Sequence, residues 1–346
     1  MTSETVSPTN AGAPADASQW TRILAKYRTP NHARSLFELA VSLLPFIAIW
    51  ALAWWVLQYS GWLALGLAVF NALFLVRLFM IQHDCGHGAF FRSRAFGDWI
   101  GRGLGVLTLT PYDVWRQSHA IHHASTGNLD RRGTGDVPTL TVAEYRAKSR
   151  LGRLIYRLYR NPVVLFGLAP IYVFFLQNRV PVGLRGPQGR YWLNAMVTNA
   201  LLFSGLGLVI WFGGFKPVLL VFLPTMMVAS SIGMWLFFVQ HQFEHTSWEH
   251  EENWSIHDAA LHGSSYYVLP GVLRWFSANI GAHHIHHMAS RIPFYRLSEV
   301  LRDHDILAQN HRLTLRESLG CARLHLWDEK RQRLLSFAQA RQLNAA

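Results

Sequence analysis

Eleven of the eighteen histidines in this 346-residue chain lie in four short clusters. Most of the histidines in a cluster are three or four residues apart, so on a helix they share one face and their imidazoles can bind one metal ion. The four clusters are His83-Asp84-Cys85-Gly86-His87, His119-Ala120-Ile121-His122-His123, His241-Gln242-Phe243-Glu244-His245 and His283-His284-Ile285-His286-His287. A lone histidine is more often an ordinary core or surface residue, but four such clusters have little structural purpose unless they share a metal.

The number and type of these ligands indicate which metal would bind. A structural zinc site takes four ligands and often includes thiolates, whereas nine or ten imidazoles are available here, enough for two ions of higher coordination number. We therefore favour two iron ions, and the composition leaves copper open as an alternative. Cys85 is expected to be a small apolar filler. The nearby carboxylates of Asp84, Asp130, Asp136 and Glu244 can accept hydrogen bonds from metal-bound imidazoles, with pairing to arginines as the alternative for Asp130 and Asp136.

Four apolar segments are long enough to cross the hydrocarbon layer, which takes about 20 residues of helix. They cover residues 37–59, 62–81, 192–212 and 217–239, and the short connections within each pair predict two helical hairpins. Arg77, near the end of the second segment, is expected to extend to the headgroups. Residues 162–176 are apolar but shorter and contain Pro170, which favours an interfacial or re-entrant helix over a fifth span.

The distribution of positive charge predicts which side of the membrane each loop occupies. Of the 32 Lys and Arg residues, 4 precede the first span, 15 lie between the second and third, and 11 follow the fourth. Positive loops remain cytosolic, so both termini and all four histidine clusters are expected on the cytosolic side. The net charge of +12 would also suit nucleic acid, but the long apolar runs favour a membrane surface and no nucleic-acid partner.

These observations predict an all-α integral membrane protein. Four transmembrane helices in two hairpins would carry a cytosolic helical cap that holds a histidine-ligated di-iron site. Residues 1–30 are expected to be a disordered cytosolic tail, because residues 1–19 are rich in Ser, Thr, Pro and Ala. Residues 31–325 would form the domain, and residues 326–346 a cytosolic C-terminal helix or tail.

From about Arg77 to Leu297, the chain resembles the membrane fatty-acid desaturase family, and within it the bacterial acyl-lipid desaturases. The resemblance includes the three histidine boxes HDCGH, HAIHH and HHIHH. It extends to the longer strings PYDVWRQSHAIHHASTGNLDRRGTGD, WLFFVQHQFEHTSWEH and NIGAHHIHHMASRIPFYRL, which are far more specific than a bare HxxHH pattern.

The resemblance implies a ligand set, a reaction and partners. His241 would contact an iron through water, and nine histidines would bind the two irons directly: His83, His87, His119, His122, His123, His245, His283, His286 and His287. The family uses O2 and two electrons to introduce a cis double bond into an acyl chain, here that of a lipid in the bacterial inner membrane. Because the chain shows no haem motif or dinucleotide fingerprint, the electrons would come from an external ferredoxin, flavodoxin or cytochrome.

Five basic residues of the central segment suggest where such a carrier would bind. Arg131, Arg132, Arg150, Arg153 and Arg157 could dock an acidic protein, or they could instead face anionic lipid.

Two other functional classes remain as alternatives. A related membrane di-iron hydroxylase or ketolase, acting on alkyl or carotenoid substrates, uses similar histidine boxes. A metal transporter or a haem carrier fits less well, because transporters place their ligands within the membrane and b-type haem needs only two axial histidines.

Overall fold

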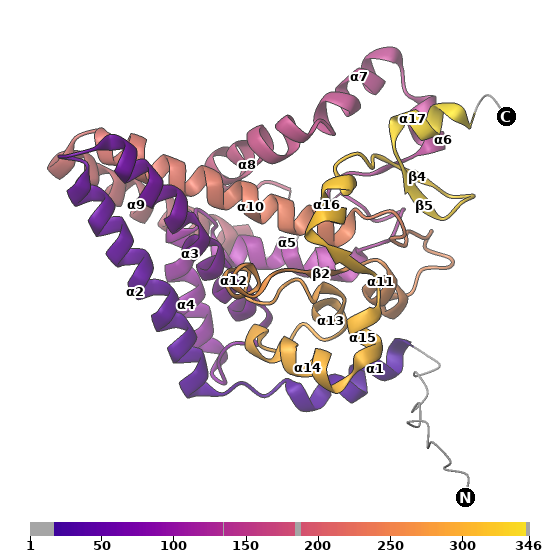
Figure 1. The fold of residues 1–346 in the computed structure, drawn as a ribbon, viewed down its shortest axis with the longest axis horizontal. Coiled ribbons are helices and arrows are strands. Elements are labelled where there is room, and N and C mark those ends of the chain that lie inside the picture. The colour runs from indigo at the N-terminus through magenta and orange to yellow at the C-terminus, as the bar shows by residue number, and fades with distance from the viewer. Residues whose placement is uncertain (1–16, 134, 184–187, 344–346) are drawn as a thin grey trace, which may run out of the picture.

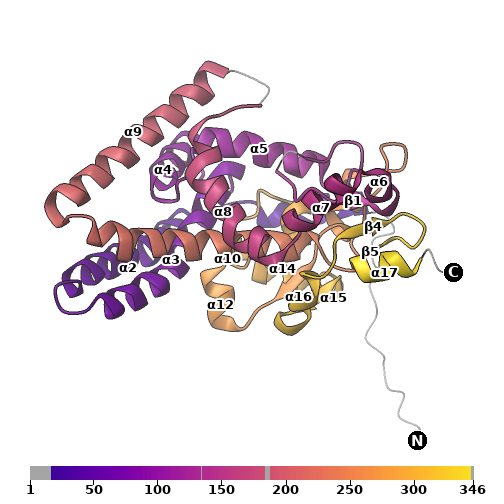
Figure 2. The same ribbon diagram turned by 90° about the horizontal axis from the view of Figure 1, so that it is seen from above.

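The computed structural model describes residues 17–133, 135–183 and 188–343. Four helices in this part of the chain are long and apolar enough to cross a membrane, and they coincide with the four predicted spans. They are α2 (His32–Val56), α3 (Gly61–His87), α9 (Gln188–Gly213) and the helix Val218–His241, which opens with the π-helical turn η5 (Val218–Phe222) and continues as α10 (Leu223–His241). In Figure 2, α9 leans away from α2, α3 and α10.

Helices α2 and α3 form an antiparallel pair in which local capping fixes both starts (Figure 1). The side chain of Asn31 accepts a hydrogen bond from the backbone N–H of Arg34, and Ser60 caps α3 through Leu63 in the same way. At its other end α3 stops at Gly88, whose φ of +66° is the left-handed conformation that terminates many helices. The HDCGH box therefore occupies the last turns of α3.

The prediction that Arg77 extends to the headgroups is wrong. Its side chain is buried and forms an ion pair with Glu38 of α2, which is also buried. The guanidinium also donates to the Ser42 hydroxyl and the Trp275 carbonyl, and it lies 3.9 Å from the centre of the Trp275 ring. These partners replace water inside the protein, so burial of the charge becomes tolerable.

The segment between α3 and α9 is mostly helical. It comprises α4 (Arg94–Leu107), α5 (Tyr112–Ser125), β1 (Leu140–Thr141), α6 (Val142–Ala147) and α7 (Arg150–Tyr159), followed by η2 (Val164–Leu168), α8 (Ala169–Ile171), η3 (Tyr172–Leu176) and η4 (Gln177–Arg179). The last four continue one another and meet α7 at an angle of 59°, a geometry typical of a broken span or a re-entrant loop. The bend is compatible with the re-entrant helix predicted for residues 162–176 and equally with a broken fifth span.

Short helices and strands follow α10. They are α11 (Ile256–His262), β2 (Tyr266–Val268), α12 (Gly271–Phe276), α13 (His283–Met288), η6 (Phe294–Arg296), α14 (Leu297–Asp303), α15 (Asp305–Gln309), β3 (Arg312–Thr314), α16 (Leu315–Cys321), β4 (Leu326–Asp328), β5 (Arg333–Leu335) and α17 (Phe337–Gln342). Strand β4 pairs in parallel with β1 and antiparallel with β5, and β2 pairs in parallel with β3. These strands of two or three residues depart from the all-α prediction.

The N-terminal segment is more ordered than predicted, and the C-terminal segment contains the predicted helix together with two strands. Residues 1–16 of the expected tail lie outside the described residues, but residues 17–27 form α1 (Ala17–Ile23) and η1 (Leu24–Tyr27). Trp20, Leu24 and Tyr27 are buried at helical spacing, and the Tyr27 hydroxyl donates to Asp303. At the other end, β4 and β5 pair with each other and α17 packs against β5, so residues 326–342 are part of the fold.

Candidate metal centre

Five histidines form what we call the first histidine group: His83, His87, His119, His123 and His286. One ring nitrogen of each lies within 4.8 Å of those of all the others. The Nε2 atom of His119 is 3.0 Å from Nε2 of His83, 3.0 Å from Nε2 of His87 and 3.1 Å from Nε2 of His123. The Nε2 atom of His286 lies 3.1 Å from Nε2 of His123. The Nε2 atoms thus point to a common centre.

Four further histidines form the second histidine group: His122, His241, His283 and His287. The Nε2 atom of His283 is 2.9 Å from Nε2 of His241 and 3.1 Å from Nε2 of His287. The two groups are neighbours, since the rings of His123 and His287 stack with their centroids 4.1 Å apart.

Helical spacing explains how two HxxHH boxes supply both groups. On α5, His119 and His123 are four residues apart and join the first group, whereas His122, rotated by about 100°, joins the second. On α13 the assignment is reversed, because His283 and His287 join the second group and His286 joins the first. His284 points elsewhere, as predicted, and is buried beside Tyr266.

The structure does not bring His245 into either group. Helix α10 ends at His241, and Gln242 leaves helical geometry with a φ of −114° and a ψ of 62°. The i, i+4 relationship predicted for His241 and His245 therefore fails, and His245 is exposed. His241 is buried and meets the other imidazoles itself, so the fourth cluster contributes one histidine instead of two.

The nitrogen geometry fits metal ions better than hydrogen bonds. One Nε2 carries at most one hydrogen, so that of His119 cannot bond to three other Nε2 atoms at once. Two ligands about 2.1 Å from a common ion are about 3.0 Å apart at a right angle and about 3.4 Å apart at the tetrahedral angle. The observed separations match the right angle, and five donors exceed a tetrahedral shell. The first group therefore fits an ion of octahedral preference, and the second group offers four donors with similarly short separations.

Burial keeps these imidazoles in the state that metals require. Outside the four candidate membrane spans, burial is the main cause that holds the pKa values of five histidines well below the usual range, and neighbouring histidines lower these pKa values further. These pKa values belong to His119, His123, His283, His286 and His287. A neutral imidazole keeps a free lone pair, which a metal ion needs.

Several partners fix the orientation of the rings from behind. Asp136 Oδ1 lies 2.6 Å from Nδ1 of His122, and Asp84 Oδ1 lies 3.2 Å from Nδ1 of His83. His241 Nδ1 lies 3.2 Å from the Gly263 carbonyl oxygen. An Nδ1–H donated to an oxygen leaves the Nε2 lone pair directed at the centre. The other two carboxylates that the sequence suggested as partners of the imidazoles lie elsewhere. Asp130 pairs with His250, and Glu244 pairs with Arg333.

Trp115 is a residue of the site that the sequence did not single out. Its ring stacks on that of His119, with centroids 4.6 Å apart and an interplanar angle of 16°. A Cβ atom on Gly86, inside the HDCGH box, would lie 2.7 Å from the Trp115 ring. The sequence feature that could have indicated this role is the position of Trp115, an aromatic residue one helical turn before His119. On the other side Phe237 contacts the rings of His122 and His241.

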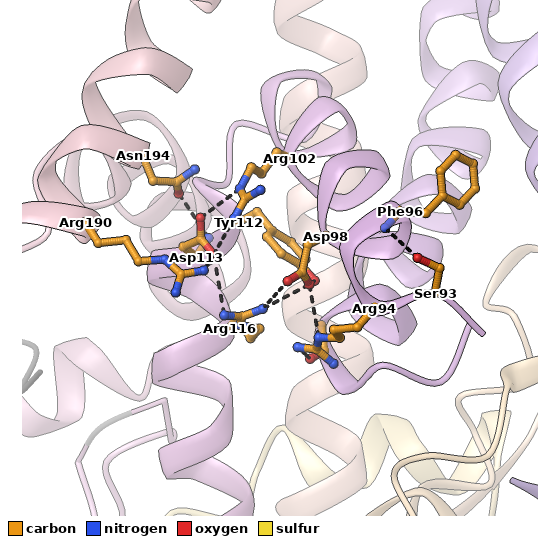
Figure 3. A network of polar contacts seen from close by, with 11 residues as sticks. Ser93, Arg94, Phe96, Asp98, Arg102, Tyr112, Asp113, Arg116, Arg190 and Asn194 are labelled. Atoms are coloured by element: carbon orange, nitrogen blue, oxygen red, sulfur yellow. Dashed lines mark hydrogen bonds and ion pairs between the residues drawn. The ribbon is translucent and has the colours of Figure 1, made fainter. Parts of the chain in front are cut away.

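A polar network anchors the start of α5 (Figure 3). Asp113, in its first turn, is buried and accepts from Arg102 of α4 at 2.9 Å and from Arg190 of α9 at 3.0 Å. The Asn194 side chain of α9 accepts the Asp113 backbone N–H at 3.0 Å. Arg116 joins Asp113 to Asp98 of α4, contacting the two carboxylates at 3.6 and 3.0 Å. Helix α5, which supplies three imidazoles, is thus attached to α4 and α9.

Comparison with known proteins agrees with this geometry. The family model described as fatty acid desaturase matches residues 60–318. A protein named "Fatty acid desaturase" from Bacillus subtilis is 42% identical over 319 residues, which cover 92% of this chain and 90% of that protein.

Two proteins of a Synechocystis strain are more distant relatives. The "sn-1 acyl-lipid omega-3 desaturase (ferredoxin)" is 29% identical, over 64% of this chain and 61% of its own length. The "sn-1 oleoyl-lipid 12-desaturase" is 24% identical, over 77% and 73%. These names favour desaturation over hydroxylation or ketone formation. The chain therefore belongs to the fatty acid desaturase family of oxidoreductases.

Proposed function

We propose that this protein introduces a cis double bond into the acyl chain of a membrane lipid, with two iron ions as cofactor. Two hydrogens leave adjacent methylenes, and together with two protons and two electrons from a carrier they reduce one O2 to two waters. The convergence of nine imidazoles in two adjacent groups is the observation that carries the proposal. The acyl-lipid desaturases among the relatives support the class of substrate.

The two histidine groups would hold one ion each. His83, His87, His119, His123 and His286 would bind the first, and His122, His241, His283 and His287 the second. Bound iron supplies the oxidant strong enough to remove hydrogen from an unactivated methylene. We propose His241 as a direct ligand in place of His245, because only His241 reaches the other rings.

The residues around the groups hold the ligands and exclude water. Asp84, Asp136 and the Gly263 carbonyl fix the imidazole tautomers. The rings of Trp115 and Phe237 flank the groups with apolar surface, which suits an alkyl substrate and keeps water from a reactive oxidant.

We further propose that the four long helices cross the inner membrane of a bacterium as two hairpins, with both termini and the metal centre in the cytosol. Histidines from before and after the central segment belong to the same two groups, which supports a single membrane face for all the clusters. The 15, 11 and 4 basic residues of the central, C-terminal and N-terminal segments support the cytosolic side.

An external ferredoxin, flavodoxin or cytochrome would deliver the electrons. Three of the relatives that are named acyl-lipid desaturases have "ferredoxin" in their names. Arg131 and Arg132, which the sequence suggested for docking, already pair with Glu251 and Glu144. An acidic carrier would have to compete with these carboxylates for either arginine.

Expression in a desaturase-deficient host tests the proposal. Gas chromatography and mass spectrometry of the host lipids should reveal new unsaturated acyl chains, and elemental analysis of the purified active protein should find two irons per chain. His286→Ala should abolish both the new acyl chains and the bound iron. His304→Ala should preserve them, because His304 lies outside the two histidine groups. Hydroxylated or keto products, or active protein without iron, would overturn the proposal.

A further inference from the structure

Helix α7 exposes a continuous apolar face. Leu151, Leu154, Ile155 and Leu158 are 65%, 53%, 58% and 55% exposed. Because an α-helix turns about 100° per residue, these four side chains lie within an arc of about 100°. Tyr156 points to the opposite side, where it is buried and its hydroxyl donates to the His325 carbonyl. The helix is thus attached to the protein by one face and presents four large apolar side chains on the other.

Positive charge accompanies this apolar face. Arg150 and Arg157 are exposed, and helical geometry places both at one edge of the apolar arc. Lys148 precedes the helix, and residues 145–160 contain no Asp or Glu. An amphipathic helix with large apolar residues on one face and arginines beside them is typical of a helix that lies in the headgroup layer of an anionic membrane.

The segment that follows α7 also points to a membrane environment. Residues 160–163 lead from α7 directly into the apolar segment Val164–Arg179, which bends away by 59°. Leu168, Tyr172 and Leu176 of that segment are also more than half exposed. Figure 1 shows α7 projecting beyond α8 at one side of the molecule. A bilayer covers both apolar surfaces at once, whereas an acidic carrier protein would satisfy only the arginines.

A groove of about 390 Å³ runs beside the same helix. It is lined by Pro138, Lys148, Gly152, Ile155, Tyr156 and Tyr159. The lining is mainly carbon, with one ammonium group. This combination suits a phospholipid, whose phosphate can pair with Lys148 while its apolar part contacts Ile155. Pro138 is two residues from Asp136, the partner of His122, so the groove is adjacent in the chain to the metal centre.

We propose that α7 lies in the headgroup layer of an anionic phospholipid bilayer, with its four apolar side chains inserted, and that its groove binds one phospholipid. This surface contributes no metal ligand, and it would attach the region next to the second histidine group to the membrane.

A spin label on Leu154→Cys tests the first half of the proposal in the full-length protein. Cys85 and Cys321 are both buried, so the introduced thiol is the reactive one. In nanodiscs of phosphatidylglycerol and phosphatidylethanolamine, the label should be relaxed by oxygen and shielded from a water-soluble nickel chelate. Leu208→Cys, exposed on α9, is the matched lipid-facing control, and Glu252→Cys is the water-facing control.

The accessibility ratio of oxygen to nickel at position 154 should resemble that at 208 and exceed that at 252 several-fold. A water-like ratio would overturn the proposal, and so would shielding from both agents, which would indicate a protein partner. In phosphatidylcholine the ratio at 154 should fall towards the water-like value, and Arg150→Gln should reduce the difference between the two lipid compositions.

Native mass spectrometry tests the groove. Lys148→Glu should reduce retention of phosphatidylglycerol several-fold, whereas Lys330→Glu, also exposed, should leave it unchanged. Equal retention in both variants would remove the groove from the proposal. None of these measurements requires turnover, so they remain informative if the proposed reaction is wrong.

Discussion

Adjacent residues of one histidine box point into different histidine groups. His122 and His123 belong to different groups, and so do His286 and His287. Neighbours on a helix are rotated by about 100°, so one helix between two centres can serve both. The HxxHH pattern therefore contributes two imidazoles to one group and one to the other, which a simple HxxxH pair cannot do.

The contrast between His241 and His245 gives the sharpest prediction at this scale. His241→Ala should lower activity at least about 100-fold and reduce bound iron, because it removes a buried donor from the second group. His245→Ala should retain most of both, since that side chain is exposed. Lipid profiling and iron analysis of the two variants check this. The opposite result would restore the ligand set implied by the family resemblance.

The carboxylate behind His122 gives a second prediction. Asp136→Asn should weaken iron binding by about 10–100-fold, because the amide is a poorer acceptor for the His122 Nδ1–H. Titration with a competing chelator measures the affinity. Asp130→Asn is the control, since Asp130 pairs with exposed His250 outside the groups. Equal iron affinity in the two variants would contradict the role of Asp136.

The family resemblance implied eight of the nine grouped imidazoles as direct ligands, and each of the eight lies on a helix where a spacing of three or four residues has a fixed geometrical meaning. It failed at His245, where the helix ends one turn early. Trp115 was missed because its role depends on a contact with Gly86, 29 residues earlier, and a helical pattern does not report contacts between helices.

Among the elements, α5 is the one most dependent on its neighbours. It supplies three imidazoles, but its start is held by side chains of α4 and α9. Its own N-cap residue is Pro111, which makes no capping hydrogen bond through its side chain. The polar network therefore does the work that a local cap performs for α2 and α3.

Removal of the shared anion should loosen this attachment. Asp113→Asn should destabilise the protein by about 1–3 kcal/mol, because Arg102, Arg190 and Arg116 lose a charged acceptor that is itself buried. The half-life of activity at elevated temperature measures the change. Glu252→Gln, an exposed acid-to-amide change of the same kind, should leave that half-life nearly unaltered.

Long elements were predictable and short ones were not. Each of the four spans carries its signal in about 20 consecutive apolar residues. By contrast, β1, β4 and β5 have two or three residues each, and β1 pairs with β4 across more than 180 positions. Trp20, Leu24 and Tyr27 do carry a helical pattern, but the polar composition around it led to the prediction of a disordered tail.

At the scale of the whole molecule, many buried neutral histidines link stability to pH. In the metal-free protein, the pKa values of His119, His123, His283, His286 and His287 lie well below 6.5. The unfolded chain binds protons below about pH 6.5 and the folded chain does not, so acidification favours unfolding. Each group contributes up to about 1.4 kcal/mol per pH unit.

Iron-free protein should therefore unfold at a lower denaturant concentration at pH 5.5 than at pH 7.5. Intrinsic tryptophan fluorescence follows the transition. Added iron should reduce the difference between the two midpoints at pH values where the metal remains bound. An imidazole whose lone pair binds iron cannot take up a proton there. Identical midpoints for the metal-free protein at the two pH values would show that the histidines are not neutral when folded.

The reciprocal use of α5 and α13 also determines how the centre fills. Helices α5 and α13 each contribute to both histidine groups. The first ion to bind would therefore fix the rotation and depth of both helices, and the remaining imidazoles would already be arranged for the second ion. Uptake should consequently be cooperative. With less than a full complement of iron, the population should divide into empty and doubly loaded molecules, and singly loaded ones should be scarce.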